Sequence, residues 1–467
     1  MPGSDALLSM FPEHLLLGGM IIGILCALGT RTRALVLPVS LVVVAASATA
    51  AFWLAATGVS AEPFPGQYLL TPDRAAAKGW LLALALPVLL MSRVETDDFQ
   101  YPLLVVCSLY GLALLPSAQN ALVLFLGLEL LSIPVYALIV LSFRRPQAAE
   151  SALKYLIMSG AGSALFLMAM SLLYGATGSM SADAMGQAVA SRDPLAQGAV
   201  LLAVASLFLK GAVVPFHAWA PDTYEGASIP VTAYLATLSK AAVLVVALRL
   251  FHGIVFAGAM ADVMAALPLV SIVWGNLAAI RQPSLRRMLA YSSIAHAGYL
   301  FYAFLGDPVG REQAVLFYLV VYAASTLLAF AAVPADGDDT RRDQLDSLDG
   351  LFRRNPLAAG LLTVAMLSLA GLPPLPGFTA KFLIFKSVVA AGYTPWAVAG
   401  LVGSFLGLYF YLRIVMRMFM EPGVATDGSA APEPAGPGVP LARLAGVLCL
   451  AATLGLMVAP GWLLARL

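Results

Sequence analysis

The chain has 467 residues, of which 61% are apolar and only 11% are charged, and its formal net charge at pH 7 is +1. Soluble domains are about 45–50% apolar and about 25% charged, so this composition excludes a soluble globular protein. The near-zero net charge, without a basic cluster in the sequence, also gives no indication of a nucleic-acid partner.

Apolar runs long enough to cross about 30 Å of hydrocarbon recur along the chain, which predicts an all-α polytopic membrane protein in a lipid bilayer. The segment before the first run contains Asp5 and Glu13 but no Lys or Arg, so we expect this run to be a retained span and not a cleaved signal. About fourteen spans are predicted, at residues 14–30, 34–57, 78–92, 102–116, 120–142, 151–174, 197–216, 230–251, 262–280, 288–305, 312–333, 357–386, 394–420 and 441–464.

The distribution of arginines between the loops predicts the orientation of these spans. If the N-terminus lies outside, the basic residues at 31–33, 93, 144–145, 281–287 and 341–354 all fall on the inner side. Short inner loops carry an excess of Lys and Arg. We therefore expect both termini on the periplasmic side of a bacterial plasma membrane.

Two predicted spans are interrupted by proline. The seventh carries Pro215 in LKGAVVPFHAW, and the twelfth carries Pro373, Pro374 and Pro376 in LAGLPPLPGFTAKF. In lipid, the carbonyl groups freed by such breaks need partners, so broken helices occur where protein or a water-filled cavity covers them. Breaks at matching places in two halves are typical of inverted repeats around a midplane site, although two unrelated proline kinks would give the same pattern.

Ionisable side chains inside the predicted spans are the candidate functional residues. A charge at the centre of a membrane helix costs about 2.5–3.5 kcal/mol on insertion scales, and such residues usually mark proton or ion paths. Most of the six lie near mid-membrane when depth is counted at about 1.5 Å per residue. This common depth favours a lateral proton relay over a static Glu–Lys pair that only locks helices together. The six residues are Glu129, Lys154, Lys210, Lys240, His296 and Lys381.

Two groups of residues can be interpreted in more than one way. Lys154 lies near the inner end of the sixth span, where its long stem also allows the ammonium to reach the headgroups. His217, Trp219, Asp222 and Glu225 follow the first break. They indicate either a mouth for proton uptake at the inner surface or side chains that cap irregular backbone.

Five segments carry a resemblance to a known family. They resemble the antiporter-like membrane subunits of respiratory complex I, the bacterial NADH:quinone oxidoreductase, and within that family the subunit N branch, of which a lysine at 381 is typical. The segments are GLELLSIPVYAL (127–138), ESALKYLIMSGAGSALFLMAMSLLYGATGS (150–179), LKGAVVPFHAWAPDTYEGASIPVTAYLATLSKAA (209–242), QPSLRRMLAYSSIAHAGY (282–299) and LAGLPPLPGFTAKF (369–382).

The resemblance implies a fold of about fourteen transmembrane helices, with two inverted repeats and with helices 7 and 12 broken. Residues 1–100 would hold the first three helices, 101–251 the first antiporter-like repeat, 252–420 the second, and 421–467 a flexible loop and the last helix.

The resemblance also implies roles for the candidate residues. Glu129 and Lys210 would form a charge pair. Lys240 would be the central relay and Lys381 the proton exit residue, while Lys154 and His296 occupy further polar positions of the family.

By the same resemblance, the chain would couple quinone reduction elsewhere in the complex to proton translocation, with other membrane subunits of complex I as partners. We expect no cofactor in this chain, because the sequence has no GxGxxG after a strand and no CxxC spacing. Flavin, iron–sulfur clusters, NADH and quinone would belong to partner subunits. The alternative function is that of an Mrp-type cation/proton antiporter subunit, which shares the fold and the lysines.

Overall fold

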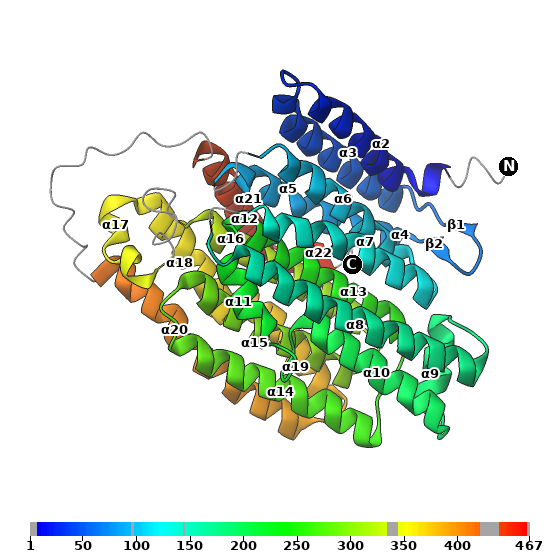
Figure 1. The fold of residues 1–467 in the computed structure, drawn as a ribbon. Helices are drawn as coiled ribbons and strands as arrows, with labels where there is room; N and C mark the ends of the chain where they lie inside the picture. The colour runs from blue at the N-terminus through cyan, green and yellow to red at the C-terminus, as the bar shows by residue number, and fades with distance from the viewer. Residues whose placement is uncertain (1–6, 95–97, 143–144, 334–343, 421–438, 465–467) are drawn as a thin grey trace.

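The computed structural model describes residues 7–94, 98–142, 145–333, 344–420 and 439–464. Long helices lie side by side through most of this part of the chain, as Figure 1 shows. The structure therefore confirms the predicted all-α membrane fold.

The first half of the chain contains the N-terminal helices and the first broken helix. Its helices are α2 (Phe11–Leu28), α3 (Val36–Ala56), α4 (Pro72–Ala83), α5 (Ala85–Leu90), α6 (Gln100–Leu114), α7 (Ala121–Val140), α8 (Ala148–Thr177), α9 (Ala182–Ala190), α10 (Pro194–Gly211), α11 (Trp219–Gly226), α12 (Ile229–Tyr234) and α13 (Lys240–Leu250).

The second half contains the second broken helix and the C-terminal span. Its helices are α14 (Gly258–Ile280), α15 (Leu285–Tyr302), α16 (Arg311–Ala331), α17 (Leu351–Arg354), α18 (Pro356–Ala370), α19 (Pro376–Ala390), α20 (Thr394–Met420), α21 (Val439–Val458) and α22 (Pro460–Leu464).

Twelve helical stretches within the described ranges are long and apolar enough to cross a membrane. Two further predicted spans correspond to α15 and to the pair α18 and α19. Helix α15 is less apolar because it carries Arg286, Arg287 and His296, and each half of the broken pair has only 15 residues. Together these elements account for the predicted number of spans, which was about fourteen.

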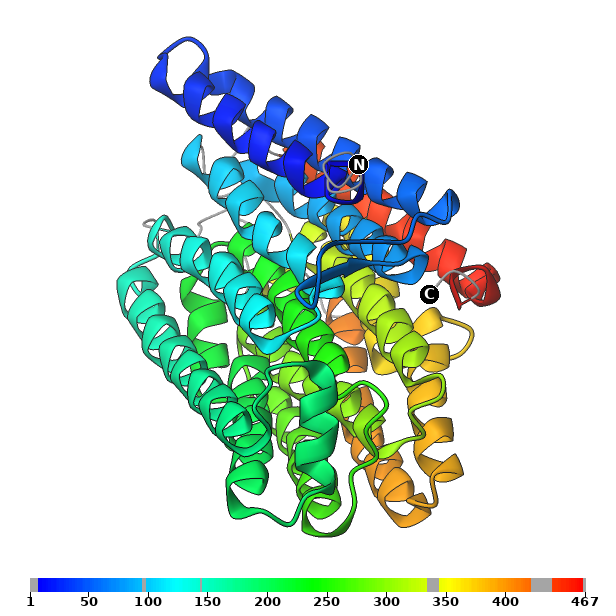
Figure 2. The ribbon, with the colours of Figure 1, turned by 90° about the vertical axis from the view of Figure 1, so that its right-hand side faces the viewer.

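The N-terminal helices form an edge of the molecule. Helices α2 and α3 lie together at one side in Figures 1 and 2, and the C-terminal helix α21 returns to pack against α5 and α16. The first and last parts of the chain therefore meet in space, although they are far apart in sequence.

A small β-hairpin, which the sequence reading did not predict, connects α3 to α4. Strands β1 (Ala61–Phe64) and β2 (Tyr68–Leu70) are antiparallel, and Gly66 in the turn between them has a φ of 69°. A left-handed residue in a tight turn favours glycine, so the Pro-Gly pair at 65–66 was the sequence signal for this turn.

The prediction that Glu13 lies in a tail before the first span is wrong. Helix α2 already begins at Phe11, and Glu13 is buried within it. Hydropathy places the start of a span at the first uninterrupted apolar run, so it misses a helical turn that carries a buried charge.

Both predicted helix breaks are present and are built alike. Helix α10 ends at a left-handed residue, Ala212, and α18 ends at another, Gly371. Prolines follow each of them, and α11 and α19 then resume the helix. A residue in the left-handed conformation is a common way to end a helix, because it lets following amides reach the last carbonyl groups. The assignment of the two halves as inverted repeats with the boundaries given above stays a prediction.

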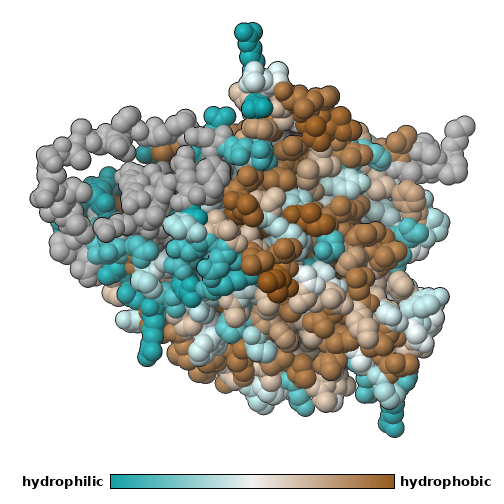
Figure 3. All heavy atoms as spheres, in the orientation of Figure 1, coloured by the Kyte–Doolittle hydropathy of each residue, from teal (hydrophilic) through white to brown (hydrophobic). Residues whose placement is uncertain are grey.

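Apolar side chains cover much of the surface of the molecule. Figure 3 shows brown, hydrophobic residues over a broad part of the visible face, while teal, hydrophilic residues gather mainly toward the end near α17. Many large apolar residues are exposed along α2, α7 and α20, as expected for helices that face lipid or neighbouring membrane helices.

The orientation of the chain is testable by labelling. With both termini outside, a tag at Leu467 should react with a membrane-impermeant reagent in intact cells, while a cysteine placed in the segment 336–354 should react only after permeabilisation. The basic residues of the loops are expected to stay on the inner side of the membrane, because their translocation is unfavourable. Several of those residues, including Arg144, Arg341 and Arg342, lie outside the described part of the chain. The reverse labelling pattern would contradict the fourteen-span orientation.

Candidate functional site

The first pair of predicted residues is in contact. The Lys210 ammonium donates to Glu129 Oε1 at 3.2 Å and to Ser159 Oγ at 3.3 Å. Ser163 donates a further hydrogen bond to the same carboxylate oxygen. The side chains of Lys210 and Glu129 are only 5% and 20% exposed, so the pair is largely shielded from its surroundings.

Lys210 lies in the last turn of α10, directly before the break. The carbonyl groups at a helix C-terminus carry partial negative charge, which favours a cation there. The break also leaves carbonyl groups without helical partners, and the Trp219 indole donates to one of them, the oxygen of Leu209, at 3.0 Å. On the other side of the break, Ser271 Oγ accepts from the amide of Val214 at 2.8 Å.

These contacts bear on the two interpretations of the segment after the break. Trp219 caps irregular backbone, as one interpretation held. His217 accepts a hydrogen bond at Nε2 from the indole of Trp274 at 2.9 Å. Residues 219–226 form helix α11, most of which is buried.

Lys240 lies at the centre of the molecule and is only 4% exposed. Its ammonium donates to the backbone oxygen of Ser293 and, at 2.5 Å, to Ser293 Oγ, and it lies 5.9 Å from the ring centre of Tyr322. A π-helical turn, η4 (Leu235–Ser239), directly precedes it. Such turns are rare and are frequent at functional sites.

A small cavity lies beside Lys210. It has a volume of about 10 Å³, and its wall includes Lys210, Ser159 and Ser239, the residue before Lys240. Ser132 and Tyr155 add hydroxyl groups to its wall. A cavity of this size holds about one water molecule, and the wall offers the polar partners that a buried water needs.

His296 is surrounded by tyrosines. Its Nδ1 is 2.9 Å from the hydroxyl of Tyr318, and its Nε2 is 3.3 Å from that of Tyr411. The imidazole also lies against the rings of Tyr322 and Tyr299, with centroid distances of 4.8 Å and 5.6 Å. Both ring nitrogens therefore have a hydroxyl partner, so a proton on either one is accommodated.

Lys381 is 8% exposed and lies where α19 passes the end of α18. Its ammonium donates to the oxygen of Ala370, the last residue of α18, at 2.9 Å and to Ser404 Oγ at 3.1 Å. It also lies 4.9 Å from the ring centre of Tyr299. The ammonium of Lys381 thus lies at the C-terminal end of α18, although the residue belongs to α19, whereas Lys210 belongs to the half-helix whose end it occupies.

The contacts form a continuous series through the second half of the molecule. It runs from Lys240 to Tyr322, then to His296, to Tyr299 and to Lys381. Within the described residues, no carboxylate lies within ion-pair distance of Lys240 or Lys381. Neutral oxygens and aromatic rings therefore hold both ammonium groups.

The sequence reading did not identify the tyrosines of this series. Tyr299 follows His296 by three residues, and Tyr322 follows Tyr318 by four, spacings that place each pair on one helix face. This spacing is visible in the sequence, but tyrosine in a membrane helix is more often an interfacial residue.

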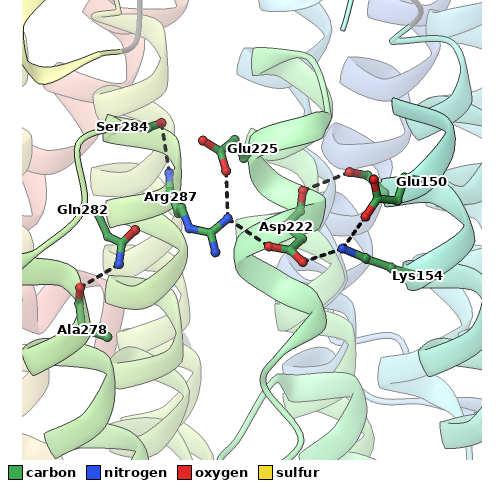
Figure 4. Close-up of polar contacts among 9 residues, drawn as sticks. Glu150, Lys154, Asp222, Glu225, Ala278, Gln282, Ser284 and Arg287 are labelled. Carbon is green, nitrogen blue, oxygen red and sulfur yellow. Dashed lines mark hydrogen bonds and ion pairs between the residues drawn. The ribbon is translucent and has the colours of Figure 1, made fainter. Parts of the chain in front are cut away.

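Lys154 belongs to a separate, more exposed network, shown in Figure 4. Its ammonium is 40% exposed and lies 2.6 Å from a Glu150 oxygen and 2.7 Å from Asp222 Oδ2. Asp222 Oδ1 in turn accepts from Arg287 at 2.9 Å, and Arg287 also binds Glu225 at 2.8 Å. An open pocket of about 350 Å³ is lined by Lys154, Glu150, Asp222 and Glu225.

The charge of Asp222 is stabilised by this network. Partial burial alone would raise the pKa of Asp222, but hydrogen bonds from Lys154 and Arg287 outweigh it and hold the pKa below its usual value. The network is therefore intact above the lowered pKa of Asp222 and is lost as the pH falls through it. This geometry supports the interpretation that Lys154 reaches the surface, and it does not bring Lys154 into the buried series.

The position of Lys154 gives a prediction. Lys154→Ala should reduce proton pumping by the assembled protein much less than Lys210→Ala, because Asp222 keeps Arg287 as its partner and the buried series is untouched. Proton uptake by membrane vesicles, normalised to the amount of assembled complex, measures both. Equal losses for the two variants would show that Lys154 acts within the path.

No group of three or more His, Cys, Asp or Glu side chains that could hold a metal ion occurs in the part of the chain that the structure describes. The cysteines Cys26, Cys107 and Cys449 are free thiols. The site is thus built from lysines, one carboxylate, one imidazole and hydroxyl groups, a set suited to holding and passing protons.

The chain is similar to known membrane proteins. Residues 118–407 match the family described as NADH:quinone oxidoreductase/Mrp antiporter, transmembrane. NADH-quinone oxidoreductase subunit N of Pelobacter propionicus is 37% identical over 430 residues, which cover 91% of this chain and 92% of that protein.

Solved structures give the same result for the fold. A chain of respiratory complex I from Thermus thermophilus superimposes with a TM-score of 0.82 at 34% identity, covering 97% of this chain and 98% of its own length. A chain of the Mrp complex from Dietzia superimposes with a TM-score of 0.83 but is only 22% identical, covering 99% of this chain and 96% of that one, so that likeness concerns the fold alone.

Proposed function

The chain belongs to the subunit N family of antiporter-like membrane subunits of NADH:quinone oxidoreductase, and we propose that it carries protons across the membrane within that enzyme complex. It is a multi-pass membrane protein and a subunit of an enzyme complex. We also propose which residues move the proton and how the chain is oriented in the membrane.

One observation carries the proposal. Four ionisable groups, Lys210, Lys240, His296 and Lys381, have side chains that are almost fully buried. A water-sized cavity adjoins Lys210 and the residue before Lys240, and contacts with the rings of Tyr322 and Tyr299 connect the other three. Leaving a charged group in a membrane interior is costly, and such groups usually serve ion or proton transfer. A series of them that crosses the molecule provides successive binding positions for a proton.

Each residue has a defined task in this path. Glu129 stabilises the protonated form of Lys210, and the cavity between Lys210 and Ser239 offers the position for a bridging water. Lys240 receives the proton at Nζ, where both oxygens of Ser293 accept its hydrogen bonds. His296 would hold the proton between Lys240 and Lys381, because its ring lies against Tyr322, which contacts Lys240, and against Tyr299, which contacts Lys381. Its two nitrogens have the hydroxyl groups of Tyr318 and Tyr411 as partners.

The lysines without a carboxylate partner are suited to passing a proton on. An ammonium held by neutral oxygens has no counter-ion that fixes its charge, so a change in local hydration or in a neighbouring charge shifts the balance between its two forms. Lys240 and Lys381 are of this kind, whereas Lys210 has Glu129. Movement of Glu129 relative to Lys210 is therefore the natural step at which a signal from the rest of the complex enters the path.

The partners follow from this function. We place NADH oxidation and quinone reduction on other subunits, because the sequence has neither a dinucleotide-binding fingerprint nor closely spaced cysteines. The neighbours in the membrane would be the other membrane subunits of the complex, and both termini would lie on the periplasmic side of a bacterial plasma membrane.

Native gels of the source membrane, combined with proton-pumping measurements, test this function. We expect the chain to migrate with NADH dehydrogenase activity, and we expect vesicles to acidify when NADH reduces quinone. Migration in an assembly without NADH dehydrogenase activity, together with cation-dependent proton exchange in vesicles, would instead support the Mrp-type antiporter function.

A further inference from the structure

A second buried ion pair lies outside the series of proton-carrying residues. Glu13 of α2 and Lys78 of α4 are 1% and 0% exposed, and they form a salt bridge. The family match begins only at residue 118, so this pair belongs to the N-terminal part of the chain that lies outside it. Hydropathy had placed both residues at the edges of spans, where charged side chains are ordinary.

Tyr68 of β2 completes the cluster. The Lys78 ammonium donates to the Tyr68 hydroxyl at 2.7 Å and to Glu13 Oε1, and the hydroxyl lies 2.9 Å from the same Glu13 oxygen. The ammonium also lies 5.1 Å from the centre of the Tyr68 ring. Two helices and the hairpin are therefore joined at one buried point.

A pair buried this deeply depends on both partners. Removing one of them leaves an uncompensated buried charge, whereas replacing both by neutral groups of similar volume is often tolerated. Glu13 Oε1, the Lys78 ammonium and the Tyr68 hydroxyl each contact the other two. The cluster therefore joins its three elements at a fixed point.

The hairpin that contains Tyr68 is hydrogen-bonded to the residues at the start of α7. Tyr68 pairs with Ala118, the amide of Gln119 donates to the oxygen of Gln67 at 2.9 Å, and Asn120 Nδ2 donates to the oxygen of Gly66 at 3.0 Å. Asn120 is also the N-cap of α7. The first residues of α7 are thus held by the hairpin that the Glu13–Lys78 pair anchors.

Helix α7 carries Glu129. Nine residues separate Asn120 from Glu129, about 13 Å of helix at about 1.5 Å per residue. A helix transmits a shift of its end to the side chains along it, because its backbone hydrogen bonds keep it rigid over this length. A displaced hairpin would therefore change the distance between Glu129 and Lys210.

We propose that Glu13, Lys78 and Tyr68 are positioning residues that hold the outer end of α7 and thereby place Glu129 against Lys210. The inference rests on the proposed function of the Glu129–Lys210 pair. It adds that the placement of this pair is set partly by an ion pair in the N-terminal helices, on the other side of the hairpin.

The test uses the complete complex in its native membrane. Tyr68→Phe removes only the hydroxyl group and leaves the ion pair, Glu13→Gln and Lys78→Met each leave one partner alone, and the combined Glu13→Gln/Lys78→Met variant removes both charges. The exposed Asp183→Asn in α9 is the matched control for loss of a surface carboxylate. Assembly on native gels, the pH profile of proton pumping per quinone reduced, and hydrogen exchange of residues 118–123 are measured for each.

We expect the assembled single variants to pump roughly 10-fold less per quinone reduced, since misplacement by about 1 Å costs up to about 100-fold in an aligned site. Their pH profile should shift, and residues 118–123 should exchange faster. The combined variant should recover most of both properties, and Tyr68→Phe should show the same changes in milder form with full assembly.

A purely structural joint gives a different result. It would lower the amount of assembled complex but leave the pH profile and the exchange of residues 118–123 in the assembled fraction as in the parent, and that result would overturn the inference. If Glu13→Gln and Lys78→Met do not assemble, Tyr68→Phe decides the matter by the same two measurements. The proposed function fails separately, through full pumping by Glu129→Ala, while the exchange measurement does not depend on proton transfer at all.

Discussion

Assembled complex that carries Glu129→Ala is expected to lose quinone-coupled proton pumping by on the order of 100-fold, the scale of effect seen when a positioned proton-transfer group is removed. The carboxylate lies 3.2 Å from the Lys210 ammonium in an interior site, and its loss leaves that charge without a counter-ion. The uncharged lysine is then favoured, and the site no longer alternates between its two forms. Quinone reduction should fall with pumping, because the two are coupled.

Conservative variants of the same pair sharpen this prediction. Glu129→Asp keeps the charge on a shorter arm and should retain part of the activity. Lys210→Arg keeps the positive charge but should be strongly impaired, because arginine stays protonated at any relevant pH and cannot pass the proton on. Electron transfer from NADH to a soluble acceptor, which does not need this chain's path, serves as the control. Full pumping by assembled Glu129→Ala or Lys210→Arg complex would remove this pair from the path.

Lys240→Met is expected to stop proton transfer as completely as the loss of Glu129. Lys240 is the proposed central relay, it is buried beside Ser293, and methionine replaces its stem without an amine. Ser293 Oγ keeps the hydroxyl of Tyr224 as a partner at 3.3 Å, so the fold should tolerate the change.

The same vesicle assay tests this second prediction, with Lys154→Met as the matched control. Both variants remove one ammonium group, but Lys154 is 40% exposed and lies in the network with Asp222. We expect pumping to be nearly unchanged in the control and lower by on the order of 100-fold in Lys240→Met. Similar pumping by the two variants would show that the proton does not pass through Lys240.

The sequence allowed the membrane fold, both helix breaks and the candidate ionisable residues to be predicted, because each is a one-dimensional signal. An apolar run, a proline within it and a charge within it can all be read without knowing what packs against what. The contact between Glu129 and Lys210 could be expected from their similar depth. The roles of these residues stay predictions.

Other features depend on tertiary packing and were therefore out of reach. Glu13 and Lys78 are each unremarkable at a span end, and their pairing arises only because α2, α4 and the hairpin meet. Helix α11 is polar in sequence, yet most of it is buried by neighbouring helices. The tyrosines around His296 come from three different helices, so no local pattern brings them together.

The π turn before Lys240 has a consequence for how relatives of this chain should be compared. A π turn holds one residue more than an α turn, and one residue corresponds to a rotation of about 100° around the helix axis. Deleting a single residue between Leu235 and Ser239 would convert the π turn into an α turn and leave Lys240 on about the same side of the helix, because the π turn accommodates the extra residue within itself. The same deletion within the regular helix α12 would instead rotate Lys240 by about 100°. An alignment gap of one residue at 235–239 is therefore compatible with a homologue whose lysine takes the place of Lys240, whereas a gap within α12 is not.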